Sequence, residues 1–281
     1  MSVLHSPHVR AQVRGFLAED VGRGDVTTEA VVPAELRGTA RLEAREPFVV
    51  AGLPLLSVVL EEAGGGVRVE VESADGDEVD RGAALARLEG PLRTILTGER
   101  VALNLIARLS GVATVARRYA VAVSGTSARV VDTRKTTPGL RMLEKYAVRT
   151  GGAHNHRFGL DDGILVKDNH IAAAGGVTEA VGRARAAAPH GLLVEVEVTD
   201  ESELEDALAA GADAVLLDNM TPDEVARCVR RAGGKALLEV SGGITLENVA
   251  TYAATGVDLI SCGAITHSAR SVDIALEVER L

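Results

Sequence analysis

Residues 192–243 read LLVEVEVTDESELEDALAAGADAVLLDNMTPDEVARCVRRAGGKALLEVSGG. Short apolar runs that end in polar residues alternate here with stretches of helical composition. Glu197, Asp218 and Glu239 are spaced 21 residues apart, and Ser261 continues the series 22 residues later. This spacing indicates a repeated strand–helix unit with its polar residue at the carboxyl end of each strand. Such a repeat is typical of a parallel α/β sheet, either an α/β barrel or a doubly wound open sheet.

The same pattern extends on both sides of this stretch and predicts six strands. The strand-like runs are ARVVDTRK (128–135), GILVKDN (163–169), LLVEVEV (192–198), AVLLDN (214–219), ALLEVSGG (236–243) and DLISCGA (258–264). All six end in polar or small residues, whereas an open sheet would concentrate its ligand groups at one switch point. The pattern therefore favours an α/β barrel. Helical stretches lie between the strands, and Asp200 and Thr221 have the position and chemistry of helix N-caps.

The first 110 residues have a different texture and predict an N-terminal α+β open-sandwich domain. Helices are expected over 7–20 and from Pro91 to about Gly111, with strand-like alternation in 37–50 and 67–71. The final segment, SVDIALEVERL, alternates apolar and polar residues, as an antiparallel strand does. We expect it to return to the N-terminal domain. The predicted domains are 1–110 plus 266–281 and, for the barrel, 111–265.

Composition excludes several classes of protein. The 281-residue chain has no apolar run of membrane-spanning length and no N-terminal signal pattern, so we expect a cytoplasmic protein without a membrane span. Its two cysteines are far apart and form no CxxC, which argues against a disulfide framework or a thiolate zinc site. A net charge of −10, six aromatic residues and no tryptophan argue against nucleic-acid binding.

Positive charge is nevertheless concentrated in one window. Residues 129–170 contain eight Lys or Arg against five Asp or Glu, in a chain that is strongly acidic elsewhere. Three of the four lysines and three of the seven histidines lie in this window. Chance clustering is one interpretation; the alternative is a local site for an anion inside an acidic protein. Lys145 and Lys235 have no evident role and are interpreted as surface residues.

Several cations of this window lie at predicted strand ends. Arg134 and Lys135 follow the first strand, Lys167 ends the second, and His156 and Arg157 lie just before it. Arginine presents a planar fork to a carboxylate, and lysine a point charge to a phosphate or carboxylate. The alternative is that these side chains are solvated loop residues. His154 and His156 could together suggest a metal site, but neighbouring arginines disfavour a cation there, so a hydrogen-bonding or substrate-orienting role for His156 is preferred.

Acidic and small residues form the complementary set. Glu195, Glu197, Asp218 and Glu239 are expected to converge on the mouth of the barrel, with Glu195 deeper than Glu197; which of these two is the key carboxylate stays open. Carboxylates facing cations suit a Mg²⁺-bound polyphosphate or a cationic transition state. Small residues follow the last two strands, where barrels often bind phosphate: Ser241, Gly242, Gly243 and Gly263. Together these groups suggest transfer from a phosphorylated sugar to a carboxylated acceptor.

The motifs that carry these residues resemble those of the quinolinate phosphoribosyltransferase family. They are EDVGRGDVTTEA, ERVALNLIARLSGVAT, DTRKTTPGLRMLEKYAVRTGGAHNHRFGLDDGILVKDNHI, the EVEV strand, LLDNM, EVSGGI and SCGAITHS, and they span nearly the whole chain. The resemblance implies that quinolinate and phosphoribosyl pyrophosphate give nicotinate mononucleotide, pyrophosphate and CO₂, with Mg²⁺. It also implies a homodimer in which the N-terminal domain of one subunit closes the barrel of the other.

The resemblance also implies roles for individual residues. Quinolinate carboxylates would be held by Arg134, His156, Arg157 and Lys167, together with Arg100 of the partner subunit. Catalysis would involve Lys135, Glu197 and Asp218, which meet phosphoribosyl pyrophosphate, and Glu197 and Asp218 would face its metal. The 5′-phosphate would lie against Ser241, Gly242, Gly243 and Gly263.

Two other functions stay open at this point. One is a related phosphoribosyltransferase for another anionic heterocycle, such as the molybdenum-associated relative of the family. The other is a carrier module, because residues 72–90 are similar to half of a biotinyl or lipoyl domain. That segment contains no lysine to carry a prosthetic group.

Overall fold

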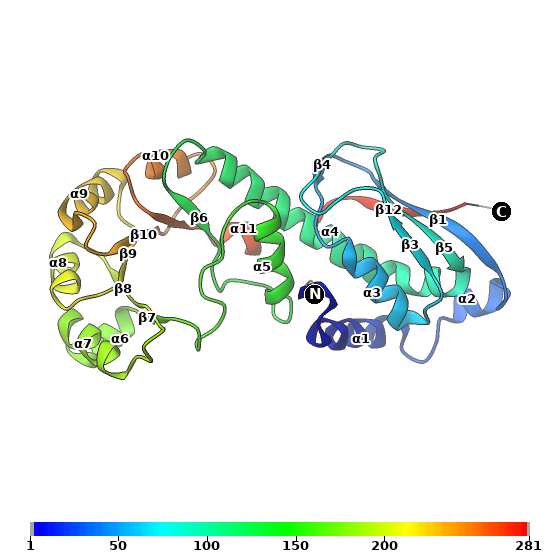
Figure 1. Cartoon of the computed structure of the whole chain (residues 1–281), viewed down its shortest axis with the longest axis horizontal. Coiled ribbons are helices and arrows are strands. Elements are labelled where there is room, and N and C mark those ends of the chain that lie inside the picture. The colour runs from blue at the N-terminus through cyan, green and yellow to red at the C-terminus, as the bar shows by residue number, and fades with distance from the viewer. Residues whose placement is uncertain (1–2, 280–281) are drawn as a thin grey trace. The chain divides into compact units, whose positions relative to one another are not determined.

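The computed structural model describes residues 3–279, which divide into two compact units (Figure 1). Of the described residues, the first unit comprises 3–117, 137–152 and 269–279, and the second comprises 118–136 and 153–268. The predicted domain ranges, 1–110 plus 266–281 and 111–265, differ from these units chiefly at 137–152. The domain boundaries themselves stay a prediction.

The first unit contains a four-stranded antiparallel sheet. Its strands, in spatial order, are β12 (Ile274–Glu279), β1 (Arg37–Ala44), β5 (Ala84–Pro91) and β3 (Arg68–Val71); β2 (Phe48–Val49) pairs with β4 (Glu78–Val79). Every second residue of β1 is buried, as expected for a strand with one face on a core. The C-terminal strand β12 pairs antiparallel with β1, so the predicted return of the final segment is confirmed.

Helices pack beside this sheet: η1 (Val3–His5), α1 (Pro7–Val21), α2 (Val26–Val31), α3 (Pro54–Ala63) and α4 (Leu92–Ala122). The prediction that the last of these ends near Gly111 is wrong, because α4 continues to Ala122. Gly111 has another function. A Cβ at this position would lie 1.9 Å from the backbone oxygen of Arg270, so glycine allows the chain to cross closely over the helix.

Helix α5 (Arg141–Thr150) belongs to the first unit because a buried carboxylate ties it to α4. Glu144 is fully buried and accepts hydrogen bonds from Arg108 Nε and Nη2, at 3.0 and 2.8 Å, and from Thr137 Oγ1 at 2.7 Å. The neighbouring Lys145 is only 4% exposed, so its interpretation as a surface residue is wrong. A buried lysine depends on partners supplied by the fold, and no local sequence pattern encodes them. Lys235 is exposed, as expected.

The second unit contains the predicted parallel sheet of six strands. In spatial order they are β6 (Arg129–Val131), β11 (Leu259–Ser261), β10 (Leu237–Ser241), β9 (Ala214–Asp218), β8 (Val194–Val198) and β7 (Ile164–Val166). All five pairings between neighbours are parallel. Within residues 3–279 the strand pairing does not join β6 to β7, so these two strands are the ends of the sheet.

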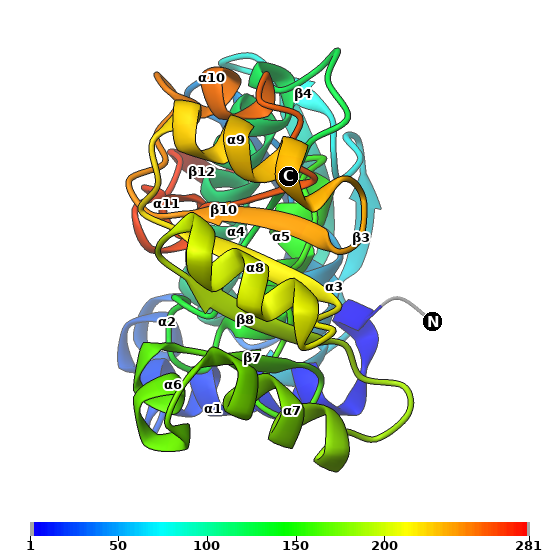
Figure 2. The ribbon, with the colours of Figure 1, turned by 90° about the vertical axis from the view of Figure 1, so that its left-hand side faces the viewer.

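Helices alternate with these strands and lie outside them (Figure 2). They are α6 (Asp168–Ala174), α7 (Val177–Ala187), α8 (Glu201–Ala209), α9 (Pro222–Ala232), α10 (Val249–Ala253) and α11 (Ala264–His267). The predicted caps are confirmed: Asp200 accepts from the first turn of α8, and Thr221 and Glu224 form a capping box at α9. The segment between β7 and β8 forms two helices, α6 and α7, since Gly175 and Gly176 interrupt it with positive φ.

The next two features of residues 3–279 are the state of the cysteines and the character of the helices. Both cysteines, Cys228 and Cys262, are free and buried. Among residues 3–279, no helix combines the length and the apolar character that crossing a membrane requires.

Candidate active site at the carboxyl ends of the parallel strands

The register of the second unit places the predicted donor-side residues on one face of its sheet. Glu197 and Glu239 are both level with Leu216 of β9, and Asp218 is level with Ser241. Residues that pair across parallel strands point to the same face, as do residues two apart on one strand. Glu195 therefore also lies on this face, two residues deeper than Glu197, as predicted.

Lys167 and Glu197 form the first contact between the predicted cations and carboxylates. Lys167 Nζ lies 2.5 Å from Glu197 Oε2, and the lysine side chain is 46% exposed. The backbone N–H of Lys167 donates to His170 Nδ1 at the start of α6, which fixes the point where the lysine leaves the strand. The pair is partly exposed, so its Coulomb energy is small and Lys167 can exchange this partner for an anion.

Asp218 is oriented by the next residue, Asn219. The side-chain amide of Asn219 donates to Asp218 Oδ2 at 2.7 Å, and its backbone N–H donates to the carbonyl oxygen of Ser241 at 2.9 Å. Asn219 has a φ of 55°, the left-handed conformation that asparagine tolerates better than most residues. This single strained residue connects the carboxylate of β9 to the loop after β10.

The loop after β10 passes against Asn219 at Gly242, whose φ is 95°. A Cβ at Gly242 would lie 2.1 Å from Asn219 Oδ1. Gly263 has a similar close neighbour, since a Cβ there would lie 3.1 Å from the Lys135 side chain. The carbonyl oxygen of Lys135 accepts from Thr266 Oγ1 at 2.8 Å, so Lys135 and Gly263 are held together.

Gly242→Ala tests this close approach. The added methyl group must displace Asn219, and the positive φ adds backbone strain, so we expect the protein to lose about 1–3 kcal/mol of stability. Thermal unfolding of both proteins measures the change. Gly191→Ala is the control, because a Cβ at Gly191 meets nothing within 4 Å. Equal losses in the two variants would contradict the argument.

Arg157 is the partly buried cation of the acceptor-side set. Burial lowers the pKa of Arg157, and the nearby Arg134 lowers it further. Its Nη1 donates to the carbonyl oxygen of Gly163 at 2.9 Å, which holds the guanidinium beside the start of β7. The following loop is closed by Asp162, whose carboxylate accepts the N–H groups of Phe158 and Gly159. Two neighbouring guanidinium groups give positive charge that favours an anionic ligand.

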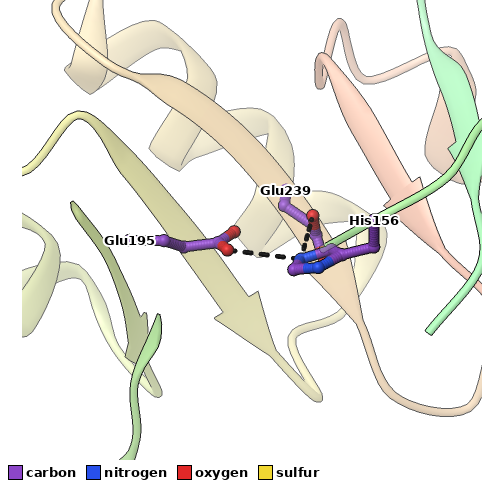
Figure 3. Close-up of side chains that lie close together, drawn as sticks. All are labelled: His156, Glu195 and Glu239. Carbon is purple, nitrogen blue, oxygen red and sulfur yellow. Dashed lines mark ion pairs between the residues drawn. The ribbon is translucent and has the colours of Figure 1, made fainter. Parts of the chain in front are cut away.

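His156 lies between two buried carboxylates (Figure 3). Its Nε2 is 3.2 Å from Glu195 Oε2 and 3.4 Å from Glu239 Oε2. Burial lowers the pKa of His156, but hydrogen bonding to the two carboxylates outweighs this effect and raises it to about 10. Burial raises the pKa of Glu239. Both shifts favour the protonated forms of His156 and Glu239.

The structure thus separates residues that the sequence grouped together. Glu239 is 1% exposed and contacts His156, and it lies two residues deeper than Asp218, because Ser241 is the residue level with Asp218. The repeat spacing made Glu239 equivalent to Asp218, but β10 extends two residues beyond Glu239, whereas β9 ends at Asp218. Arg100 lies on α4 and is exposed. Sequence reasoning missed Asn219, although asparagine after a strand-end aspartate is a signal for a left-handed turn.

A parallel α/β sheet with arginines, lysines and carboxylates gathered at its strand ends defines a class of enzyme that handles anionic substrates. Two family models together match most of the chain: the N-terminal domain of quinolinate phosphoribosyl transferase over residues 25–110 and its C-terminal domain over 112–277. The chain belongs to the quinolinate phosphoribosyl transferase family.

Relatives of this family are similar to the chain over nearly their full length. The chain is 46% identical to the nicotinate-nucleotide pyrophosphorylase [carboxylating] of Mycobacterium leprae, covering 96% of both chains. It is 45% identical to the probable enzyme of that name from Bacillus subtilis, covering 94% of this chain and 91% of the relative. The crystal structure of NadC from Streptococcus pyogenes superposes with a TM-score of 0.94 at 38% identity, covering 97% of each chain.

Proposed function

We propose that this protein transfers the phosphoribosyl group of phosphoribosyl pyrophosphate to quinolinate, with loss of CO₂, and so forms nicotinate mononucleotide and pyrophosphate. The observation that carries the proposal is the arrangement of Lys167, Glu197 and Asp218 at the carboxyl ends of neighbouring strands in a chain of this family. This arrangement provides positive charge for an acceptor and negative charge for the sugar cation that forms in the transition state.

On the donor side, Glu197 and Asp218 supply carboxylate oxygens on one face of adjacent strands. Such oxygens fit Mg²⁺, which prefers one or two carboxylates together with substrate phosphates. When bound, Mg²⁺ would neutralise charge on the departing pyrophosphate. Lys135 would contact the donor, and Ser241, Gly242, Gly243 and Gly263 would accommodate its 5′-phosphate through backbone groups.

On the acceptor side, Arg134, Arg157 and Lys167 would hold the two carboxylates of quinolinate. Arg157 presents a guanidinium whose Nη1 already has a partner, which fixes its plane for the remaining donors. We propose that Arg100 of the partner subunit completes this site, so that the active enzyme is a homodimer. A cytoplasmic location also stays a prediction, which cell fractionation would test.

The charges give the order of events. As pyrophosphate leaves, positive charge develops on the ribose, and Glu197 and Asp218 stabilise it while the pyridine nitrogen attacks. In the resulting pyridinium, the bond between the ring and the adjacent carboxylate breaks, the electron pair stays on the ring carbon, and a proton from solvent replaces CO₂. The cations bind one carboxylate and orient the other for this loss, so positioning is their main contribution.

Release of CO₂ tests the function directly. The purified protein is mixed with quinolinate labelled in the 2-carboxylate, phosphoribosyl pyrophosphate and Mg²⁺, and labelled CO₂ and nicotinate mononucleotide are expected in equal amounts. Omission of phosphoribosyl pyrophosphate should abolish release. Turnover of another anionic heterocycle, with no release from quinolinate, would overturn the proposal and support the alternative phosphoribosyltransferase.

A further inference from the structure

Three buried carboxylates meet the segment that delivers Arg157. They are Asp132, directly after β6, Glu195 on β8 and Glu239 on β10, with exposures of 0%, 9% and 1%. In the sheet order these are alternate strands, separated by β11 and β9. Interior positions of parallel strands are normally apolar, so three carboxylates there require a specific role.

Each carboxylate contacts residues 155–156 from inside the unit. Asp132 Oδ1 accepts the backbone N–H of His156 at 2.9 Å, and Asp132 Oδ2 accepts the side-chain amide of Asn155 at 2.7 Å. Glu195 and Glu239 reach His156 Nε2 from the other side of the ring, as Figure 3 shows. The backbone and the ring of His156 are therefore anchored separately.

The second ring nitrogen of His156 points back to the next residue. The backbone N–H of Arg157 donates to His156 Nδ1 at 2.7 Å. An N–H donor at this distance requires a lone pair on Nδ1, so the ring proton is on Nε2 and points to the carboxylates. A proton on Nδ1 would oppose the Arg157 N–H, so this contact disfavours the imidazolium that the two carboxylates by themselves would favour. Burial raises the pKa of Glu239, the more buried of the two carboxylates that face Nε2, and so favours its protonated form.

We propose that Asp132, Glu195 and Glu239 are positioning residues of the acceptor site, which anchor Asn155 and His156 so that Arg157 is held in place for the acceptor carboxylate. Both ring nitrogens of His156 are engaged within the protein, and the ring acts through the Arg157 backbone. This inference rests on the proposed function and revises the role that the family resemblance implies for His156.

The same geometry bears on a metal site. The ligand atoms of His156, Glu195 and Glu239 lie within 4.8 Å of one another, which is close enough for one ion. A histidine that binds a metal through Nε2 carries its proton on Nδ1 and donates it to an acceptor. At His156 that position faces the N–H of Arg157, so the tautomer disfavours metal binding.

Nitrogen-15 NMR of the full-length protein, with labelled histidine, tests the tautomer without reference to activity. At pH 7 we expect a protonated Nε2 and an unprotonated Nδ1 for His156. The resonances of His156 are identified as those that disappear in His156→Gln. Adding quinolinate should leave the protonation of both nitrogens unchanged. Protonation of both nitrogens, or a shift to a metal-bound resonance on adding Zn²⁺, would overturn the proposal. The NMR result does not depend on the CO₂-release assay. A wild-type protein that releases no CO₂ would overturn the proposed function and leave the protonation of His156 unaffected.

Kinetics test the positioning role. Asp132→Asn removes the acceptor of either the His156 backbone N–H or the Asn155 side-chain amide. We therefore expect the KM for quinolinate to rise about tenfold, and the KM for phosphoribosyl pyrophosphate to stay within about twofold of the wild type. Asp206→Asn, on the exposed face of α8, is the control and should match the wild type. Equal increases in both KM values would indicate a general structural defect and overturn the role.

Thermal unfolding tests where the proton lies. Glutamine has nearly the shape of a neutral glutamic acid, so Glu239→Gln should unfold within about 3 °C of the wild type. If Glu239 were instead ionised and paired with an imidazolium, the same change would break a buried ion pair and lower the midpoint by about 10 °C. The larger fall would overturn the placement of the proton.

Discussion

Asp218→Asn is expected to lower kcat about 100- to 1000-fold and to leave the KM for quinolinate within about threefold of the wild type. Asp218 ends β9 and is oriented by the Asn219 amide at 2.7 Å. A charge that is fixed before the reaction stabilises the developing sugar cation without reorganisation, and asparagine keeps the shape while removing that charge. The effect should appear in turnover because the cation exists only in the transition state.

Steady-state kinetics with each substrate varied in turn would measure the split between kcat and KM. Asp223→Asn is the matched control, because Asp223 is an exposed aspartate in the first turn of α9, five residues further on. Its kcat should stay within about twofold of the wild type. If Asp218→Asn raised the KM for quinolinate while kcat stayed unchanged, Asp218 would belong to the acceptor side of the site.

The fold was predictable where sequence spacing repeats. A strand–helix unit of nearly constant length places Glu197 and Asp218 on one face of adjacent strands, and the register confirms this placement. Alternation alone also predicts that Glu195 lies deeper than Glu197, and the register agrees, since Glu195 is level with Ala214 and Glu197 with Leu216. These inferences succeed because the periods of strands and helices are local properties of the chain.

Other features depend on contacts between distant segments and could not be predicted. Gly111 has the composition of a helix end, but its use is decided by the backbone of Arg270, far along the chain. The burial of Lys145 and of Glu144 depends in the same way on the packing of α5 in the first unit. Glu239 shows the limit of spacing, because the repeat gives its position along the chain, whereas the pairing of β10 with β9 places it two residues deeper than Asp218.

Arg157→Ala is expected to raise the KM for quinolinate about 10- to 100-fold, as suits the loss of charge-assisted hydrogen bonds, while the KM for phosphoribosyl pyrophosphate stays within about twofold. The guanidinium is held by the carbonyl oxygen of Gly163 at 2.9 Å, so it is oriented before the acceptor arrives. Kinetics at saturating phosphoribosyl pyrophosphate, with quinolinate varied, measure the effect.

Arg157→Lys separates charge from geometry. Lysine restores the positive charge but has no planar fork, so we expect the KM for quinolinate to remain about tenfold above the wild type. Arg183→Ala, which removes an exposed arginine from α7, controls for the loss of net charge and should leave both KM values unchanged. Full recovery in Arg157→Lys would mean that Arg157 acts as a point charge, and the anchoring of its backbone by His156 would then have no consequence for acceptor binding.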